Sequence, residues 1–302
     1  MTNLSKEREK TLHVSLGSQC NNNCIFCMEP RFYESSHNRT ISEHKKFIRE
    51  SFPEDFSRIV FTRKEPTLAS EKLIPLIEYA KEIGYEDIML ITNGRLLSYK
   101  SFVFRLLKAG LDHVEISLHG SNKKTHDSLT RTPGSFEQTL KGIMNVYYLF
   151  KKFNLNYSIN FTITKINYEE IEAFYKLASS FEPNNIIFNF FTTKGEASTN
   201  ADILEPEYSK VITNLKKIKK GDFSLIDFPF CVIPKDLQKN LGHIEDYHLF
   251  DEQCENNFTR NDWFDSKEEI KACGRCKYFA ACPKPSKEYI KKYGFKEFEP
   301  FL

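Results

Sequence analysis

The sequence predicts an α/β fold in which a parallel sheet curls into a partial (β/α)6 barrel of the TIM type. Two observations lead to this prediction. Short apolar or β-branched runs alternate with longer helical patterns, and polar residues recur where these runs end. Such β–α units in series are typical of a parallel sheet with right-handed crossovers. An open doubly wound sheet is the alternative, but in a barrel the carboxyl ends of the strands converge on one mouth.

The predicted strands are bounded by polar residues, and helical periodicity fills the stretches between them. The strands cover residues 12–17, 58–62, 88–94, 113–120, 157–164 and 185–193. The helices cover residues 41–51, 70–83, 99–109, 135–152, 168–181 and 205–219. The polar residues near the ends of the strands are Ser15, Thr62, Asn93, Ser117, Asn160 and Thr162. Because six strands make an incomplete barrel, we expect a lateral opening for a sizeable substrate.

Length and composition indicate a large domain with a small appendage. The chain has 302 residues, of which 40% are hydrophobic, and its formal net charge is +2. This balance gives no argument for a nucleic-acid partner. The charged start lacks the apolar stretch of a signal peptide, and no run is long enough to span a membrane. We therefore expect a cytoplasmic protein, with a barrel domain at 1–221 and a cysteine-rich domain at 222–302.

Eight cysteines are unevenly placed in this chain, and about 200 residues between the two groups carry none. Since disulfides are rare in the cytosol, two metal sites explain the grouping best. Cys20, Cys24 and Cys27 form a CxxxCxxC motif directly after the first predicted strand. Three thiolates can bind three corners of an iron–sulfur cubane and leave one iron open to a small molecule. A zinc site with His13 or His37 as a fourth ligand is the alternative.

The CxxxCxxC motif after the first strand resembles that of the radical S-adenosylmethionine (SAM) superfamily. Two further stretches agree with it in order. ITNG at 91–94 resembles the end of the third strand in that family, and ISLHGSNKKTHDSLTRTPGSF at 116–136 resembles its fourth strand and the following loop. The second stretch is similar to the subgroup that contains molybdenum-cofactor and peptide-modifying enzymes.

The resemblance implies roles for individual residues. Cys20, Cys24 and Cys27 would hold a [4Fe-4S] cluster whose fourth iron chelates SAM. Phe26 matches an aromatic position near the adenine, and Arg131 is a candidate partner for the SAM carboxylate. Further SAM contacts are expected for Lys64, Glu65, Pro66, Asn93, Ser117, Asn160 and Thr162. Each polar residue at a strand end could instead cap a helix or a loop.

The stretch after the second strand departs from the family pattern. Where the family usually has Gly-Gly-Glu-Pro, this chain has Arg63-Lys64-Glu65-Pro66. The resemblance implies that Glu65 accepts a hydrogen bond from the SAM amino group. If the backbone needs a left-handed conformation here, each replaced glycine costs on the order of 1 kcal/mol. Arg63 and Lys64 are either solvated cations or ligands for an anionic group of the substrate, and we favour the second interpretation.

The C-terminal cysteines resemble the auxiliary-cluster domain called SPASM, or its shorter twitch form. Cys273, Cys276 and Cys282 form a CxxCx5C motif, preceded by Cys231 and Cys254. The resemblance implies one auxiliary [4Fe-4S] cluster on Cys231, Cys273, Cys276 and Cys282, with Cys254 spare or substituting. A structural zinc is the alternative for this site.

The implied activity is reductive cleavage of SAM to a 5′-deoxyadenosyl radical that takes a hydrogen atom from a peptide or small-metabolite substrate. The product would be an oxidised or newly bonded substrate, for example in the maturation of a ribosomal peptide. A flavodoxin- or ferredoxin-type protein is the expected electron donor. One competing hypothesis is a non-catalytic iron–sulfur redox or sensor protein that has lost the use of SAM; another is a zinc-stabilised binding module.

Overall fold

One curved sheet organises the chain. The structure, a computed structural model, describes residues 10–29, 39–52, 56–153, 155–242, 246–250, 258–259, 271–279 and 281–301. Within these residues the strand order is β7-β6-β5-β4-β3-β2-β1-β8-β9. The strands are β1 (Lys10–Val14), β2 (Phe56–Phe61), β3 (Asp87–Thr92), β4 (His113–Ser117), β5 (Asn156–Ile163), β6 (Asn185–Phe190), β7 (Ser224–Ile226), β8 (Asp246–Phe250) and β9 (Phe258–Thr259).

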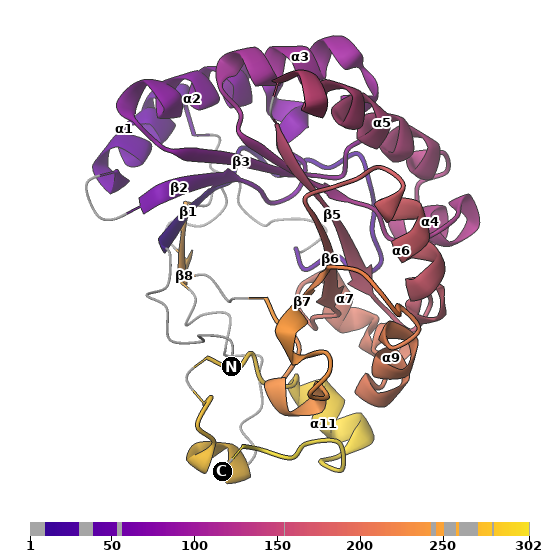
Figure 1. Cartoon of the computed structure of the whole chain (residues 1–302). Coiled ribbons are helices and arrows are strands. Elements are labelled where there is room, and N and C mark those ends of the chain that lie inside the picture. The colour runs from indigo at the N-terminus through magenta and orange to yellow at the C-terminus, as the bar shows by residue number, and fades with distance from the viewer. Residues whose placement is uncertain are drawn as a thin grey trace.

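Sequential strands from β1 to β7 pair in parallel, and β8 adds to the other side of β1 in the same direction. Only the short β9 runs antiparallel to its neighbour among the strands described. Figure 1 shows the sheet curled and open on one side, with β8 next to β1 toward one edge and β7 at the other. The predicted partial barrel is confirmed, and β7 and β8 extend it beyond the six expected strands.

The helices in the described residues are α1 (Ile41–Ser51), α2 (Ser70–Ile83), α3 (Lys100–Ala109), α4 (Lys123–Thr130), α5 (Ser135–Phe153), α6 (Ile171–Ser179), α7 (Glu196–Thr199), α8 (Ala201–Leu204), α9 (Tyr208–Leu215) and α11 (Lys287–Tyr293). Those from α1 to α6 line the convex side of the sheet, whereas α11 lies among the C-terminal segments (Figure 1). Short 3-10 turns begin at Pro66, Leu96, Tyr168, Phe230, Gln238 and Lys271.

The bounds of α2 match those predicted, and its sequence shows why. Leu73, Leu76, Ile77 and Ala80 are fully buried at helical spacing, and Gly84 ends the helix with a φ of 106°. The sequence reading missed α4, because that helix carries few apolar residues. Its two ends are instead defined locally: the Asn122 side chain accepts from the Thr125 amide at 3.1 Å, and Arg131 ends the helix with a left-handed φ of 49°.

The two faces of the sheet differ sharply in chemistry. Side chains that face the helices are apolar and fully buried, as Ile59, Leu90 and Phe188 illustrate. Residues alternating with them point to the concave face, as the strict alternation along β6 shows; some are half-buried, whereas Glu115, Ser158 and Asn160 are buried. Most side chains on this concave face are polar, among them His13, Arg58, Asp87, His113, Glu115, Ser117, Ser158, Asn160, Asn185 and Asn189. Val60, Met89, Ile91 and Ile187 lie on the same face. The barrel therefore encloses a surface of hydrogen-bonding groups.

Neighbouring strands pair these concave-face groups. Arg58 Nε lies 2.6 Å from Asp87 Oδ2, between β2 and β3. Asn160 Nδ2 donates to Glu115 Oε1 at 3.0 Å, between β5 and β4. The carboxylates on this face are thus held in place by partners on the next strand.

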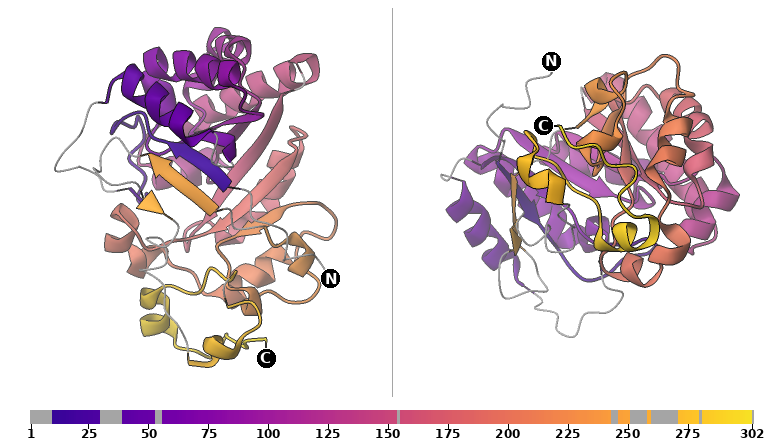
Figure 2. Two further views of the ribbon diagram at one scale, coloured as in Figure 1. Left: turned by 90° about the vertical axis from the view of Figure 1, so that its left-hand side faces the viewer. Right: turned by 90° about the horizontal axis from the view of Figure 1, so that it is seen from below.

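Residues after 221 add strands to the sheet, and the other described segments of this part of the chain pack at one end of the barrel. β7 and β8 both come from this part of the chain. Figure 2 shows the remaining C-terminal segments, in yellow, at one end of the barrel. The domain boundary near residue 221 stays a prediction. None of the helices in the described ranges has the length and hydropathy that crossing a membrane requires.

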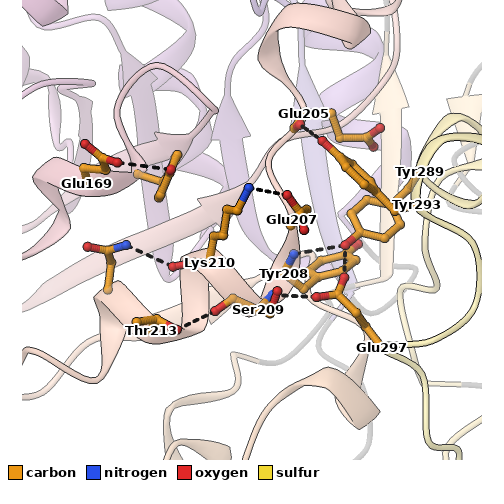
Figure 3. Close-up of polar contacts among 12 residues, drawn as sticks. Glu169, Glu205, Glu207, Tyr208, Ser209, Lys210, Thr213, Tyr289, Tyr293 and Glu297 are labelled. Atoms are coloured by element: carbon orange, nitrogen blue, oxygen red, sulfur yellow. Dashed lines mark hydrogen bonds and ion pairs between the residues drawn. The ribbon is translucent and has the colours of Figure 1, made fainter.

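A buried tyrosine attaches α11 to α9 (Figure 3). The Tyr289 hydroxyl donates to the Glu297 carboxylate and accepts from the Tyr208 amide at 3.0 Å. Glu297 also accepts from the Ser209 amide at 2.9 Å. The rings of Tyr208 and Tyr289 lie 4.5 Å apart. Because α11 follows Cys282 closely, this contact connects the C-terminal cysteine region to the barrel.

We predict that Tyr289→Phe lowers the free energy of unfolding by about 1–3 kcal/mol, because it leaves the buried partners of the hydroxyl without their hydrogen bonds. Urea denaturation followed by circular dichroism measures the change. Tyr99→Phe is the control, since the Tyr99 side chain is 64% exposed. Equal stability of the two variants would contradict the role assigned to Tyr289.

Candidate functional site

The CxxxCxxC loop follows β1 and is held on one side by the end of α4. The Asn23 amide donates to the Thr130 carbonyl at 2.9 Å, and the Ile25 amide donates to the Leu129 carbonyl at 2.9 Å. The last carbonyls of a helix have no partner within it. The cysteine loop therefore satisfies the end of α4 while α4 positions the loop.

On its other side, the loop is held by residues 196–200. The Ala197 amide donates to the Cys27 carbonyl at 2.9 Å, and the Glu196 amide donates to the Glu29 carbonyl at 3.3 Å. Asn200 Nδ2 donates to the Ile25 carbonyl at 3.2 Å. The backbone of the loop is thus fixed between two parts of the chain that lie far apart in sequence.

The three thiols lie close enough to affect one another's ionisation. Burial raises the pKa of Cys24 well above its usual range, and the neighbouring thiols of Cys27 and Cys20 raise it further. Bound iron would offset this by stabilising thiolates, so the donor set fits an iron–sulfur cluster. No three His, Cys, Asp or Glu side chains in the described residues converge to hold a single metal ion. For the zinc alternative, His37 lies outside the described residues.

Glu65 connects the ends of β2 and β3 to the cysteine loop. Its side chain is 3% exposed. Oε1 accepts from the hydroxyls of Thr67 and Thr92 at 2.5 and 2.6 Å. Oε2 accepts from the Asn93 amide at 2.8 Å, and the Glu65 amide donates to the Gln19 carbonyl at 3.1 Å. Burial raises the pKa of Glu65, and these donors oppose the rise by favouring the carboxylate.

Arg63 and Lys64 adopt the left-handed backbone that glycine favours, with φ values of 68° and 48°. The two residues that replace the family's Gly-Gly therefore both adopt this left-handed conformation. The Arg63 guanidinium forms an ion pair with Glu29, at the end of the cysteine loop. The charge of Lys64 lowers the pKa of Cys27, against the larger effect of burial, which raises it. Both cations thus lie beside the cysteine loop.

Phe26 joins the cysteine loop to the ends of β4 and β5. Its ring packs edge-on against His119, with centroids 4.6 Å apart. Burial lowers the pKa of His119 well below its usual range, so the neutral ring accepts from the Thr162 amide at Nδ1, at 3.1 Å. The His119 amide in turn donates to Nδ1 of His126 at 3.0 Å. These two histidines therefore have structural partners.

The remaining predicted SAM contacts lie at several places around the cysteine loop and the strand ends. Asn93 lies against the cysteine loop, where its Nδ2 donates to Asn21 Oδ1 at 2.6 Å. Arg131 lies on the opposite side and pairs with Glu196 at 3.4 Å. Ser117 and Asn160 are register partners on β4 and β5, and Thr162 follows on the same face. Pro66 is buried at the start of the turn after Glu65.

Sequence reasoning missed several residues that shape the site. Arg95 donates to Asn22 Oδ1 at 3.0 Å, and it also donates to the Asn21 carbonyl. Glu29 and Glu196 hold the two arginines described above. Arg95 directly follows the predicted third strand, and this position could have indicated that it lies near the site. Glu29 and Glu196 carry no comparable signal, because their partners are distant in sequence.

Four of the C-terminal cysteines line one pocket. Burial raises the pKa of Cys231 to about 11, and the nearby thiols of Cys282 and Cys273 contribute. Aromatic rings surround the thiols, and Lys284 Nζ lies 4.0 Å from the centroid of the Phe279 ring. The lining includes Phe230, Cys231, Cys273, Cys276, Tyr278, Phe279, Cys282, Lys284, Pro300 and Phe301. Cys254 lies outside the described residues.

Comparison with known sequences finds a match to the family described as Radical SAM superfamily over residues 14–178. The "AdoMet-dependent heme synthase" of Methanosarcina barkeri is 28% identical over 198 residues, 65% of this chain and 55% of that protein. This chain thus spans about half the length of that relative. A "Probable GTP 3',8-cyclase" of Saccharolobus solfataricus is 30% identical over 234 residues, 75% of this chain and 71% of that protein.

Solved structures share the fold. SuiB of Streptococcus suis, bound to S-adenosylmethionine, aligns over 96% of this chain and 76% of its own, with a TM-score of 0.64 and 14% identity. The native anSMEcpe with bound AdoMet aligns over 91% of this chain and 88% of its own, with a TM-score of 0.61 and 17% identity. At these identities the likeness concerns the fold alone.

Proposed function

The chain belongs to the radical SAM superfamily, and from this premise we propose that it is an enzyme with a SAM-binding [4Fe-4S] cluster on Cys20, Cys24 and Cys27. When bound, the cluster and SAM supply a 5′-deoxyadenosyl radical that takes a hydrogen atom from the substrate. The observation that carries the proposal is the cysteine loop itself, whose backbone is fixed on both sides and whose three thiols lie close enough to affect one another's ionisation. Membership of the superfamily implies both cofactors.

The residues around the loop would bind and orient SAM. Four hydrogen bonds hold the Glu65 carboxylate beside the loop and favour its ionised form against the burial that raises its pKa, so a cationic amino group would be a fitting ligand. Arg131, on the other side of the loop, is the candidate for the SAM carboxylate. Phe26 presents an aromatic ring that is already held by His119. These roles follow from the family resemblance together with the positions described above.

We assign the second cysteine group to an auxiliary [4Fe-4S] cluster. Cys231, Cys273, Cys276 and Cys282 line one apolar pocket, which supports Cys231 as the fourth ligand. With four thiolates no iron would remain open, so this cluster would carry electrons or brace the fold without binding substrate. A SPASM- or twitch-like domain over residues 222–302 is part of the same proposal.

The substrate would occupy the polar concave face of the barrel. Its Asn, Ser, Glu and Arg side chains suit a substrate with several hydrogen-bonding groups. The class proposed is a peptide or small metabolite that is oxidised or gains a bond. The named relatives differ, one being a heme synthase and the other a probable GTP cyclase. A flavodoxin- or ferredoxin-type donor in the cytoplasm completes the proposal, which involves no nucleic acid and no membrane.

SAM cleavage tests this function directly. We expect anaerobically reconstituted protein to release 5′-deoxyadenosine when SAM and a strong reductant are added, and the Cys24→Ala variant to release none. Liquid chromatography measures the product. The competing redox or sensor protein would hold iron but release no 5′-deoxyadenosine. If neither the natural chain nor an Arg63→Gly, Lys64→Gly variant makes it, the enzyme assignment is wrong.

Glu65→Gln should weaken SAM binding by at least about tenfold, because the amide loses the charge that attracts the SAM amino group. Gln keeps one oxygen that can accept from Thr67 and Thr92. Equilibrium binding to the reconstituted protein gives the dissociation constant. Glu78→Gln is the matched control, since Glu78 is an exposed carboxylate on α2. Unchanged affinity in Glu65→Gln would remove this residue from the site.

Iron analysis distinguishes the ligands of the auxiliary cluster. The natural chain should hold about eight irons if both clusters are [4Fe-4S]. Cys231→Ala should lower this to about four, whereas Cys254→Ala should leave it unchanged. The opposite pattern would make Cys254 the ligand, and a stoichiometric zinc content in the natural chain would support the zinc alternative.

A further inference from the structure

One short segment holds the carbonyl side of the cysteine loop. We call Gly195–Asn200 the bracing segment. It donates from Glu196, Ala197 and Asn200 to the carbonyls of Glu29, Cys27 and Ile25 respectively. These acceptors are alternate residues of the cysteine loop, so the segment contacts the loop along its length, including the carbonyl of a cysteine.

Gly195 lets this contact form. Its φ of 53° and ψ of −134° define a conformation that residues with a side chain rarely adopt. A Cβ placed there would lie 2.3 Å from the Met28 carbonyl oxygen and 2.5 Å from its carbon. It would also lie 2.6 Å from the Glu29 carbonyl carbon. These neighbours are backbone atoms, so no side-chain rotation relieves the clash.

The bracing segment cannot easily move away from such a clash. Just before it, the Thr193 hydroxyl donates to Glu288 Oε2 of α11 at 2.9 Å. Within it, Glu196 pairs with Arg131 at 3.4 Å, and the Ala197 side chain is fully buried. Met28, whose carbonyl the Cβ would meet, is 42% exposed, so this end of the cysteine loop has solvent beside it into which it can shift. A side chain at residue 195 should therefore displace the loop.

We propose that Gly195 is a positioning residue for the SAM-binding cluster: the absence of a side chain lets the bracing segment set where Cys27 and the Met28–Glu29 backbone lie. This inference rests on the proposed function, because it assumes that the loop carries the cluster. It concerns the placement of the cluster and of the SAM bound to it.

The test compares Gly195→Ala with Gly294→Ala in the full, reconstituted chain. Gly294 has a similar backbone, with φ 73° and ψ −157°, but a Cβ there would meet nothing within 4 Å. The two variants thus share the backbone strain and differ in the clash. Four quantities are measured: iron content, the dissociation constant of SAM, the rate of 5′-deoxyadenosine release, and the electron paramagnetic resonance spectrum of the reduced protein with and without SAM.

We expect Gly195→Ala to lose about 10²-fold in the rate of 5′-deoxyadenosine release, the effect typical of a displacement of about 1 Å at a reacting centre. The spectral change on SAM addition should be altered or absent, and Gly294→Ala should match the natural chain. Loss of the first cluster alone in Gly195→Ala would also support the proposal. The proposal would be overturned if the rate and the SAM affinity of Gly195→Ala lay within twofold of the natural values and its spectrum matched that of the natural chain.

Two further measurements keep the outcomes distinct. If Gly195→Ala does not fold, the Asn200→Ala variant is measured instead, because it removes one donor to the loop without adding atoms. A weaker SAM affinity and an altered spectrum in Asn200→Ala would support the proposal. An affinity and a spectrum equal to those of the natural chain would overturn it. If the natural chain cleaves no SAM, the proposed function fails. The positioning role of Gly195 is then tested by the spectra of the reduced cluster without SAM. The role is supported if the spectrum of Gly195→Ala differs from that of the natural chain while that of Gly294→Ala does not. It is contradicted if all three spectra coincide.

Discussion

The site depends on one constraint: the backbone of the cysteine loop is held between the last carbonyls of α4 and the amides at the start of α7. Both helix ends have backbone groups that need partners, and the loop supplies them. Residues 129–130 accept from the amides of residues 23 and 25, and residues 196–197 donate to the carbonyls of residues 27 and 29. The three thiols can then occupy stable positions without any regular structure of their own. A loop left to its own conformational entropy would not hold them there.

The second constraint lies at the end of β2, where charge and backbone strain coincide. Arg63 and Lys64 occupy left-handed conformations that cost each of them roughly 1–2 kcal/mol. The cost is partly offset for Arg63 by its ion pair with Glu29. Glu65 follows directly, buried and hydrogen-bonded by groups from two strand ends. The two strained residues thus place the Glu65 carboxylate beside the cysteine loop, and their own cationic side chains lie beside the loop as well.

The C-terminal cysteine region is joined to the barrel by hydrogen bonds that form among packed aromatic rings. The rings of Phe190, Tyr208 and Tyr289 stack in sequence from β6 through α9 to α11. Glu297 accepts hydrogen bonds from both helices, so it fixes their relative position. Near α7, Thr193 and Glu288 form a further contact with α11. The two cysteine groups are therefore connected through β6, α9 and α11.

The sequence predicted the class of fold, because strand and helix periodicities are local: α1 and α2 were predicted with the bounds they have. It also determined the family and the two cysteine groups, since thiolate spacing is a local property. α4 escaped prediction because it is polar, and the partners of Glu65, Arg63 and Glu29 escaped because they come from distant segments. Only the tertiary structure decided those contacts, and with them the role of Gly195, since a close approach between residues 28 and 195 depends on how α4, β6 and α7 pack.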